Sequence, residues 1–260
     1  MSPRLPLSVC LISGAEAARI GRALESVAEL ASEIIVVLNQ EVQDGTEEIC
    51  RKWGAQVYRE PWKGHIAQKN SAAAKATQPW VLGLDADEAV SPGLQAELMN
   101  LLRNPESAAA CSAYAFPRLS FFLGRWIRHG DWYPDRKVRL WQRGRARWAG
   151  IDPHDFVQVD GAVGRLRGDL LHYSNPTMGS YVQKLPYFAD LYLQQQLAAG
   201  ARWSAPVAVV RSVWRFFRAY VFRLGFLDGY PGFFIAATTA YGALVRHTRL
   251  YEHQQGTKES

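Results

Sequence analysis

The chain has 260 residues, of which 48% are hydrophobic and 21% are charged. This balance is typical of a globular protein and excludes a largely disordered chain, and the absence of a heptad or Gly-X-Y repeat excludes a coiled coil and a collagen-like fibre. The formal net charge of +6 is uneven, because residues 105–260 carry 20 basic and 11 acidic side chains. That excess predicts either an anionic partner or a solvated basic surface.

The first hundred residues alternate between two hydrophobic periods. Continuous apolar runs predict buried strands, and apolar residues at helical spacing predict helices. In chain order we expect strands at 7–13, 34–38, 56–58 and 80–84, and helices at 16–30, 44–54, 66–76 and 91–103. This β-α alternation predicts an α/β fold with a parallel, doubly wound sheet, whose ligands bind beyond the carboxyl ends of the strands.

The second part of the chain has a different pattern. After a polar break at 104–112, residues 113–172 read as short strands and loops rich in Arg and Trp. A helix is expected at 179–197, followed by an amphipathic helix at 207–224 and a 13-residue uncharged stretch at 233–245. Aromatic and arginine side chains together suit sugars and phosphates, although a nucleic-acid reader uses the same residue types.

Cysteines and apolar runs bear on the compartment. Cys10, Cys50 and Cys111 are widely spaced and include no CxxC pair, which predicts a reducing environment. Residues 7–13 are too short an apolar run for a signal peptide. No run of about 18–20 uncharged apolar residues occurs, so we expect no ordinary transmembrane helix.

Three carboxylates stand directly after the predicted strand at 80–84. They belong to Asp85, Asp87 and Glu88 in the run Leu84-Asp85-Ala86-Asp87-Glu88. Such carboxylates repel one another, and a divalent cation relieves that repulsion. The alternative interpretation is an acidic turn that only caps the helix beginning at Ser91-Pro92.

An ordered set of motifs resembles family 2, the inverting glycosyltransferases of GT-A type, and within it the lipopolysaccharide core group with beta-glucosyltransferase members. The resemblance extends over residues 6–250, which is nearly the whole chain. The segments that carry it are Asp44-Gly45-Thr46-Glu47-Glu48-Ile49, Glu60-Pro61-Trp62-Lys63-Gly64, Gln68-Lys69-Asn70, Leu82–Glu88, Asp131-Trp132-Tyr133-Pro134-Asp135, Arg139-Leu140-Trp141, Pro153-His154-Asp155 and Leu170-Leu171-His172-Tyr173-Ser174.

The resemblance implies a nucleotide-sugar donor, commonly a UDP-sugar, with Mg²⁺ or Mn²⁺ on its diphosphate. It implies that Asp85 contacts the donor, that Asp87 binds the metal, and that His172 is a candidate second metal ligand. The alternative for His172 is a histidine satisfied within the core. Further donor contacts are expected from polar residues that follow a strand or begin a helix, namely Asn39, Lys69 and Asn70. The alternative for Lys69 is a solvated lysine on the helix surface.

The resemblance also implies a carboxylate base for the acceptor hydroxyl. The usual His-Glu pair of the family falls here on His154-Asp155, so Asp155 is the candidate base and His154 a candidate acceptor contact. The alternative is that Asp155 merely caps a turn. Asp131 is the next candidate base, and with Trp132 it is expected to border the acceptor site.

One segment departs from the family pattern. An acidic residue usually follows the second strand to hold the nucleotide base, but here the loop reads Leu38-Asn39-Gln40-Glu41-Val42-Gln43-Asp44. The first acid is missing and the loop is one residue longer, so the identity of the base is open. Asn39 could still hydrogen-bond a pyrimidine edge, and Glu41 could substitute from a shifted position.

We therefore expect four parts: a nucleotide-sugar half of a GT-A-like domain at 1–104, an acceptor half at 105–200, an amphipathic membrane-surface appendage at 201–251, and a disordered tail at 252–260. The expected partners are the donor, a saccharide or glycolipid acceptor and the inner membrane surface, with the protein peripheral on its cytoplasmic face and no nucleic acid bound. The alternatives are a catalytically silent glycolipid-binding protein on the same fold, an RNA-binding protein, and a tail that only packs on the core.

Overall fold

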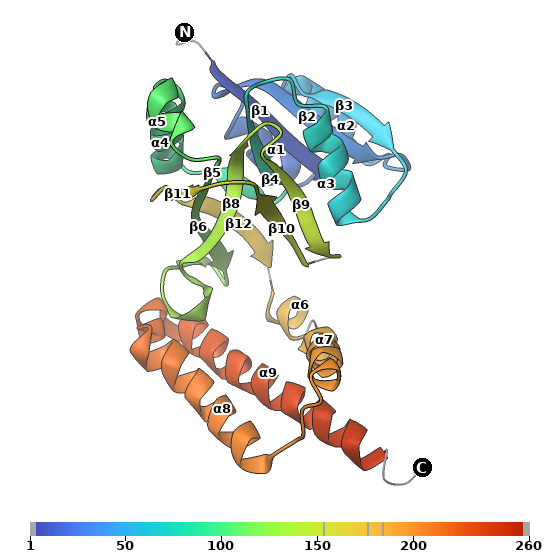
Figure 1. Cartoon of the computed structure of the whole chain (residues 1–260), viewed down its shortest axis with the longest axis vertical. Coiled ribbons are helices and arrows are strands. Elements are labelled where there is room, and N and C mark those ends of the chain that lie inside the picture. The colour runs from blue at the N-terminus through green and yellow to red at the C-terminus, as the bar shows by residue number, and fades with distance from the viewer. Residues whose placement is uncertain (1–3, 153, 176, 184, 257–260) are drawn as a thin grey trace. The chain divides into compact units, whose positions relative to one another are not determined.

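A computed structural model describes residues 4–152, 154–175, 177–183 and 185–256 (Figure 1). The chain divides into two compact units. The first unit contains the described residues up to Arg118 together with Asp135–His172, and the second contains Leu119–Pro134 and the described residues from Tyr173 onward. This division differs from the expected boundaries at 104 and 200, because residues 119–134 leave the first unit and associate with the C-terminal helices.

The predicted alternation of strands and helices in the first hundred residues is confirmed. In order, these elements are β1 (Leu5–Ser13), α1 (Ile20–Glu25), β2 (Ala31–Asn39), α2 (Thr46–Lys52), β3 (Gln56–Glu60), α3 (His65–Ala74), β4 (Trp80–Asp85), β5 (Glu88–Val90), α4 (Pro92–Leu102) and α5 (Pro105–Ala109). The short strands expected at 113–172 are also present. They are β6 (Ala113–Phe122), β7 (Arg125–Ile127), β8 (Asp135–Gln142), β9 (Ala146–Ile151), β10 (His154–Val159), β11 (Val163–Arg165) and β12 (Leu170–Asn175), with a 3-10 turn η1 (Gly130–Trp132).

Helix α1 is shorter than predicted. Instead of 16–30 it covers Ile20–Glu25, and β2 begins at Ala31. The backbone N–H of Glu16 donates to Thr46 Oγ1 at 3.0 Å and that of Ala17 to Asp44 Oδ2 at 3.1 Å. These side chains come from the loop after β2 and hold the backbone before α1 in a turn. The apolar residues at helical spacing therefore cover a longer range than α1 itself.

The loop before α2 also differs from prediction. Gly45, with φ of 88°, occupies the N-cap position, so the helix predicted to begin at residue 44 begins at Thr46. Asp44 acts one position earlier, accepting from the backbone and hydroxyl of Thr46. These hydrogen bonds, led by the Thr46 side chain, hold the pKa of Asp44 below its usual value. Asp44 therefore joins the loops after β1 and β2.

The main sheet is parallel in its first half and antiparallel in its second. Its strand order is β3-β2-β1-β4-β8-β6-β12-β5. The pairs β3–β2, β2–β1 and β1–β4 are parallel, whereas β8 runs antiparallel to both β4 and β6. This topology brings the carboxyl ends of β1, β2 and β4 to one edge, where the predicted ligand site lies.

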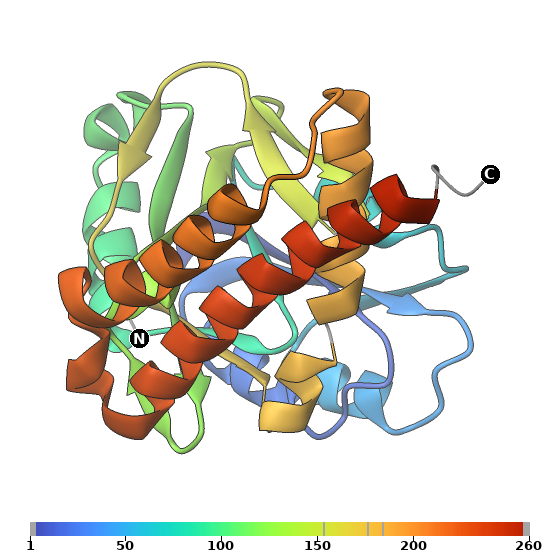
Figure 2. The same cartoon turned by 90° about the horizontal axis from the view of Figure 1, so that it is seen from below.

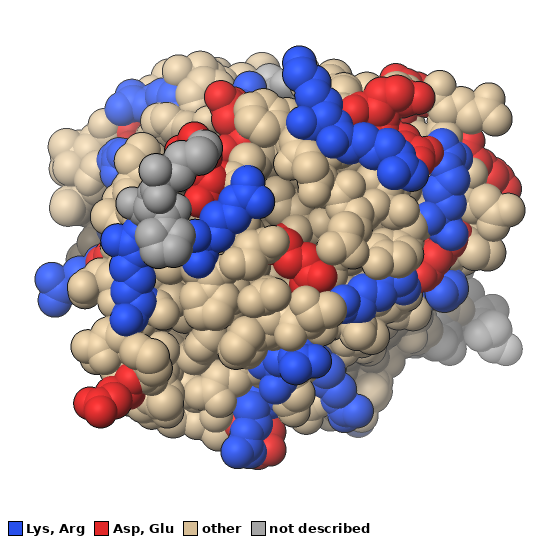
Figure 3. Space-filling model, turned by 90° about the horizontal axis from the view of Figure 1, so that it is seen from above, with Lys and Arg blue, Asp and Glu red and all other residues tan. Residues whose placement is uncertain are grey.

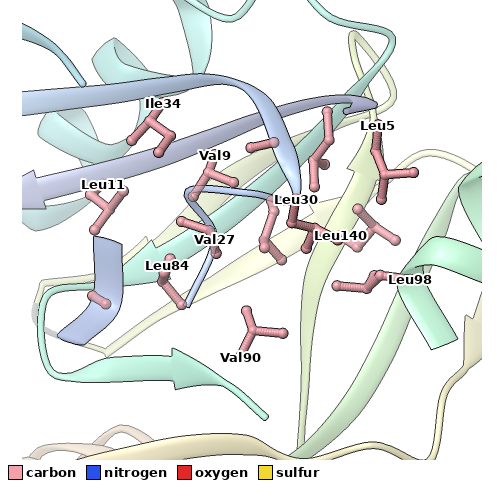
Figure 4. Packing of buried hydrophobic residues seen from close by; sticks show 14 of the residues in the cluster. Leu5, Val9, Leu11, Val27, Leu30, Ile34, Leu84, Val90, Leu98 and Leu140 are labelled. Atoms are coloured by element: carbon pink, nitrogen blue, oxygen red, sulfur yellow. The ribbon is translucent and has the colours of Figure 1, made fainter. Parts of the chain in front are cut away.

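Apolar side chains of the central strands alternate between two cores. Val9, Leu11 and Leu84 pack with Leu98 of α4 on one side of the sheet, as Figure 4 shows. Residues one position along these strands face the other core, which includes Ala72 of α3 and two tryptophans of the antiparallel half; its buried members are Cys10, Ile35, Val37, Ala72, Ala76, Val81, Ala113, Trp141, Trp148 and Val157. Burial on both faces explains why these strands read as continuous apolar runs.

The second unit is mostly helical. Its helices are α6 (Met178–Val182), α7 (Leu185–Ala198), α8 (Ala205–Phe217), a π-helical turn η2 (Arg218–Phe222), a 3-10 turn η3 (Gly225–Asp228) and α9 (Gly229–Gly256). Helix α8 lies beside α9 in Figures 1 and 2. The turn between them falls at Gly225–Asp228, and the uncharged stretch at 233–245 lies within α9. Among the described helices, none is long and apolar enough to cross a membrane.

Two further expectations concern helix ends. The single helix predicted at 179–197 is two helices, α6 and α7, with residue 184 outside the described residues. Helix α9 continues to Gly256, so the first five residues of the expected disordered tail are helical and residues 257–260 lie outside the described residues.

Candidate active site

The acidic run follows β4 directly, as predicted. Asp85 is the last residue of β4, and Glu88 begins β5 after a two-residue turn. Strand β5 pairs with β12, which places His172 opposite Glu88. Glu88 Oε2 accepts from the backbone N–H of Asp85 at 3.1 Å, so it closes the turn that presents Asp87.

A lysine joins two predicted site carboxylates that lie far apart in the sequence. Lys69 of α3 places its Nζ 2.7 Å from Asp85 Oδ1 and 2.8 Å from Asp155 Oδ2. The Lys69 side chain is only 10% exposed. Three predicted site residues, Lys69, Asp85 and Asp155, thus form one buried ion-pair chain. Lys69 lies in the second turn of α3 and is among the buried residues of this helix. The alternative of a solvated helix lysine is therefore wrong.

A buried arginine completes this chain. Arg139 of β8 places its Nη2 2.6 Å from Asp85 Oδ2 and 2.9 Å from Glu88 Oε1. The Arg139 residue is 5% exposed. Burial alone would raise the pKa of Asp85, but the charges of Arg139 and Lys69 outweigh that effect and hold the pKa well below its ordinary value. Asp85 is therefore a fixed anion.

Trp148 of β9 supports both cations. Lys69 Nζ lies 4.4 Å and Arg139 Cζ 5.0 Å from the centroid of its ring, within cation–π range. Asn70 holds this strand against α3, because its amide donates to Trp148 O and accepts from Trp148 N, both at 2.9 Å. Asn70 is thus engaged with the backbone of Trp148 in this structure, and its role as a donor contact stays a prediction.

Gly83 in β4 leaves room for the Trp148 ring. A Cβ at this position would lie 2.6 Å from Trp148 Cζ2. We expect Gly83→Ala to displace Trp148, to cost about 1–3 kcal/mol of unfolding free energy and to weaken donor binding, because the support of Lys69 and Arg139 moves. Denaturant unfolding measures the first effect. Gly93→Ala in α4 is the matched control, since its Cβ would meet nothing closer than 3.9 Å, and equal stability losses in both variants would contradict this role of Gly83.

Asp87 and His172 differ from the ion-pair chain. His172 Nε2 lies 3.7 Å from Asp87 Oδ2. Burial raises the pKa of Asp87, with Asp85 and Glu88 adding to the rise and His172 opposing it. Burial also lowers the pKa of His172 to about 4, with the positive charge of Arg118 acting in the same direction. The imidazole is therefore neutral at physiological pH, which is the form that binds metals.

An NMR titration of the histidine ring checks this assignment. We expect His172, assigned by comparison with His172→Gln, to titrate well below the ordinary pKa of about 6.5. Because the unfolded chain then takes up a proton that the folded chain refuses, this histidine should lower the stability of the fold as the pH falls from about 6.5. A ring titrating at or above 6.5 would contradict the burial argument.

Asp87 and His172 fit a divalent cation as one oxygen and one nitrogen ligand. Within the described residues, no group of three or more His, Cys, Asp or Glu side chains could hold a metal ion. Asp87 and His172 are the residues that would hold a Mg²⁺ or Mn²⁺ ion. The metal role of both residues stays a prediction.

The remaining predicted contacts lie at the strand ends. Asn39 is half-buried at the end of β2, opposite Glu60, and His154 is exposed at the start of β10, opposite Ile151. Asp152, which precedes Asp155 by three residues, accepts from Ile66 N at 3.0 Å. This hydrogen bond joins the residue after β9 to the start of α3. Asn39 and His154 stay predictions as donor and acceptor contacts.

Asp131 and Trp132 belong to the second unit. Asp131 is surrounded by arginines of the C-terminal segment, with Arg218 Nη2 at 2.7 Å from Oδ2. Trp132 packs against Phe122, with 5.1 Å between ring centroids. Trp141, which follows Leu140 in the motif Arg139-Leu140-Trp141, is buried in the core of the first unit. The roles of Asp131 and Trp132 at an acceptor site stay predictions.

Sequence reasoning missed Arg139 and Trp148 as site residues. Arg139 belongs to the motif Arg139-Leu140-Trp141 that carries the family resemblance, but the resemblance implies no site role for it. The available signal was an arginine inside a strand whose neighbours Leu140 and Trp141 are apolar, because a buried arginine requires a carboxylate partner. Nothing in the sequence singles out Trp148.

The fold and this acidic site define a class, the α/β glycosyltransferases with a GT-A-like fold. The structure of S. aureus TarS 1–349 in complex with UDP-GlcNAc aligns with 96% of the chain and 92% of its own length, at a TM-score of 0.51 and 12% sequence identity. Residues 8–167 match the family described as Glycosyl transferase family 2. The chain belongs to this family and is a glycosyltransferase.

Two relatives that match over most of their own length are also glycosyltransferases by name. The lipopolysaccharide core biosynthesis glycosyltransferase LpsC of Rhizobium meliloti is 29% identical over 260 residues, covering 97% of the chain and 94% of LpsC. An uncharacterized glycosyltransferase of Rickettsia typhi is 29% identical over 255 residues, covering 95% of the chain and 87% of the relative. The resemblance stated from the motifs is therefore confirmed at the level of the family.

Proposed function

We propose that this glycosyltransferase moves a hexose, with inversion, from a UDP-sugar to a saccharide of the lipopolysaccharide core or of a related envelope glycolipid. The observation that carries the proposal is the ion-pair chain Asp85–Lys69–Asp155, in which one buried lysine joins the acidic turn to the candidate base. The similarity to LpsC supports the class of acceptor.

The donor diphosphate would bind beside Lys69 and the acidic turn. Lys69 carries the positive charge that a diphosphate requires, and Arg139 keeps Asp85 charged and oriented. When a divalent cation is bound with the diphosphate, it supplies Lewis-acid stabilisation of the leaving group. Asp87 and His172 are the residues that would hold it.

Asp155 is the proposed base. The acceptor hydroxyl oxygen forms the new bond to the anomeric carbon, the bond from that carbon to the diphosphate oxygen breaks with its electron pair, and the hydroxyl proton passes to Asp155. Lys69 contacts Oδ2 of Asp155, which leaves Oδ1 for this proton. Attraction of Lys69 to the incoming diphosphate would loosen its contact with Asp155 as the donor binds.

The proposed acceptor implies a location for the enzyme. A glycolipid acceptor is reached at a bilayer surface, so we propose that the enzyme is peripheral on the cytoplasmic face of the inner membrane. The exposed apolar and arginine side chains of the second unit support this location.

Two alternatives make different predictions. A silent glycolipid-binding protein would bind saccharide but would not hydrolyse a donor in the presence of Mn²⁺. An RNA-binding protein would shift RNA in a salt-dependent manner and ignore nucleotide-sugars. On the face that Figure 3 shows, seen from above, basic side chains stand in separate groups with acidic side chains among them, so this face offers no continuous basic stripe for a phosphate backbone.

A thermal-shift panel tests the proposed function. UDP-, GDP-, ADP- and TDP-sugars are added with and without Mn²⁺, and a bound donor raises the midpoint by mass action. We expect a UDP-sugar to give the largest shift, to require Mn²⁺ for it, and to be slowly hydrolysed. A protein that responds to none of these donors and hydrolyses none would contradict the proposal.

A further inference from the structure

We propose that the second unit carries a docking site for an anionic phospholipid bilayer. In this site, arginines gathered around Asp131 bind headgroup phosphates. Apolar side chains of residues 207–230 enter the boundary between headgroups and acyl chains. The inference deepens the proposed function, because a glycolipid acceptor places the enzyme at a bilayer, but the evidence for the site comes from the second unit alone.

Three arginines share a single carboxylate. Arg218 Nη2 lies 2.7 Å from Asp131 Oδ2, Arg223 Nη1 3.2 Å from Oδ1, and Arg215 Nη1 4.0 Å from Oδ2. The Asp131 side chain is 10% exposed, whereas those of the arginines are 33% to 49% exposed. One mostly buried carboxylate therefore holds three solvent-facing guanidinium groups close together. The group has a net charge of +2, which suits the binding of phosphate oxygens.

Helical spacing along the amphipathic helix predicted at 207–224 places Arg211, Arg215 and Arg218 in one row, with Arg223 slightly off it, and the observed group differs from this row. Helix α8 passes into a π-helical turn at Arg218, and the chain turns at Leu224 with φ of 57°. Arg223, expected slightly off the row, instead contacts Asp131. A test that removes Arg218 would also remove the closest ion pair of Asp131, so Arg215 and Arg223 are the better probes.

The apolar side chains of the same segment face solvent because α8 and the following turns use small residues for packing. Ala208 and Ala219 are the buried residues of α8 and η2, and a Cβ on Gly232 would lie 1.9 Å from Gly225 O. The large apolar side chains are 41% to 67% exposed: Val207, Val209, Val210, Val213, Trp214, Phe217, Val221, Phe222, Leu224, Phe226, Leu227 and Tyr230. Twelve large apolar side chains exposed within one segment of 24 residues, 207–230, are typical of an interaction surface.

Charge and chemistry favour a bilayer as the occupant. Residues 201–227 contain five arginines and no acidic residue. A second copy of the chain on the same surface would bring these like charges together, because a two-fold interface pairs each patch with itself. Trp214 and Tyr230 suit the boundary between headgroups and acyl chains, and Arg125, which donates to Leu227 O at 3.4 Å, adds a cation beside the apolar turn.

Vesicle sedimentation with the full chain tests the charged part of the site. Vesicles of phosphatidylcholine alone are compared with vesicles containing phosphatidylglycerol. We expect binding only to the anionic vesicles, weakening with salt, and a roughly 30-fold loss in the double variant Arg215→Gln, Arg223→Gln. Arg249→Gln is the matched control, because Arg249 is 47% exposed but already paired with Asp190 and Glu252, and it should bind like the unaltered protein.

The apolar part is tested with Phe222→Ser, Leu227→Ser, whose side chains are 67% and 50% exposed. We expect at least a tenfold loss of binding, whereas Ile151→Ser, in the first unit and 78% exposed, should have no effect. Donor hydrolysis should be unchanged in all these variants, so failure of the proposed function and failure of docking give different results. Equal vesicle binding by the unaltered protein and both double variants, or a dimer in solution that these apolar changes dissociate, would overturn the inference.

Discussion

Asp87→Asn is expected to abolish turnover without weakening the fold. The carboxylate is the proposed metal ligand, and loss of Lewis-acid stabilisation removes several kcal/mol, which corresponds to a fall of roughly 10³-fold in kcat/KM. Because burial and the neighbouring carboxylates raise the pKa of Asp87, its charge costs stability at every pH above its unfolded pKa. Asparagine removes this cost, so the melting temperature at pH 7 should be unchanged or higher.

Asp85→Asn provides the contrast. The pKa of Asp85 is lowered by Arg139 and Lys69, so its charge contributes stability at neutral pH that is lost as the pH falls through the folded pKa. Its replacement should lower the melting temperature and weaken nucleotide binding together. Asp160→Asn, whose side chain is 83% exposed, should change neither quantity. Full turnover of Asp87→Asn with Mn²⁺-dependent donor binding intact would show that Asp87 is no metal ligand.

Asp155→Asn is expected to separate catalysis from binding. Asparagine cannot take the acceptor proton, so turnover should fall by roughly 10²–10⁴-fold, the usual scale for a general base. Its carbonyl oxygen can still accept from Lys69, and Lys69 keeps its contact with Asp85 at 2.7 Å. The donor-induced thermal shift should therefore be nearly intact. Steady-state transfer kinetics and the shift with a UDP-sugar and Mn²⁺ measure the two effects.

Asp152→Asn is the matched control for this variant. Asp152 directly follows β9, three residues before Asp155, and accepts from Ile66 N at the start of α3. Asparagine serves equally well at a helix N-terminus, so turnover should change little. If Asp155→Asn instead removed donor affinity and left the turnover of bound donor unaffected, Asp155 would belong to the donor site, and Asp131 would become the candidate base.

Local signals in the sequence correctly indicated the architecture of the first hundred residues. Continuous apolar runs predicted β1, β2 and β4 because strands buried on both faces lack polar alternation. Ser91-Pro92 predicted the start of α4, and Ser91 Oγ indeed accepts from Leu94 N at 3.2 Å. The extent of α1 was overestimated, since hydrogen bonds from Asp44 and Thr46 hold the preceding residues in a turn, and these side chains come from another loop.

The sequence by itself determined the family, the order of the strands and helices in the first half, and the place of the acidic turn, because each of these depends on residues that are neighbours in the chain. Only the tertiary structure decided that Lys69 joins Asp85 to Asp155, that Asn70 binds the backbone of Trp148, and that Arg139 is an internal cation. The physical reason is that burying a charged or polar side chain costs free energy unless it has an ion-pair or hydrogen-bond partner. Which partner it finds is fixed by the pairing of strands far apart in sequence, and no local pattern records that.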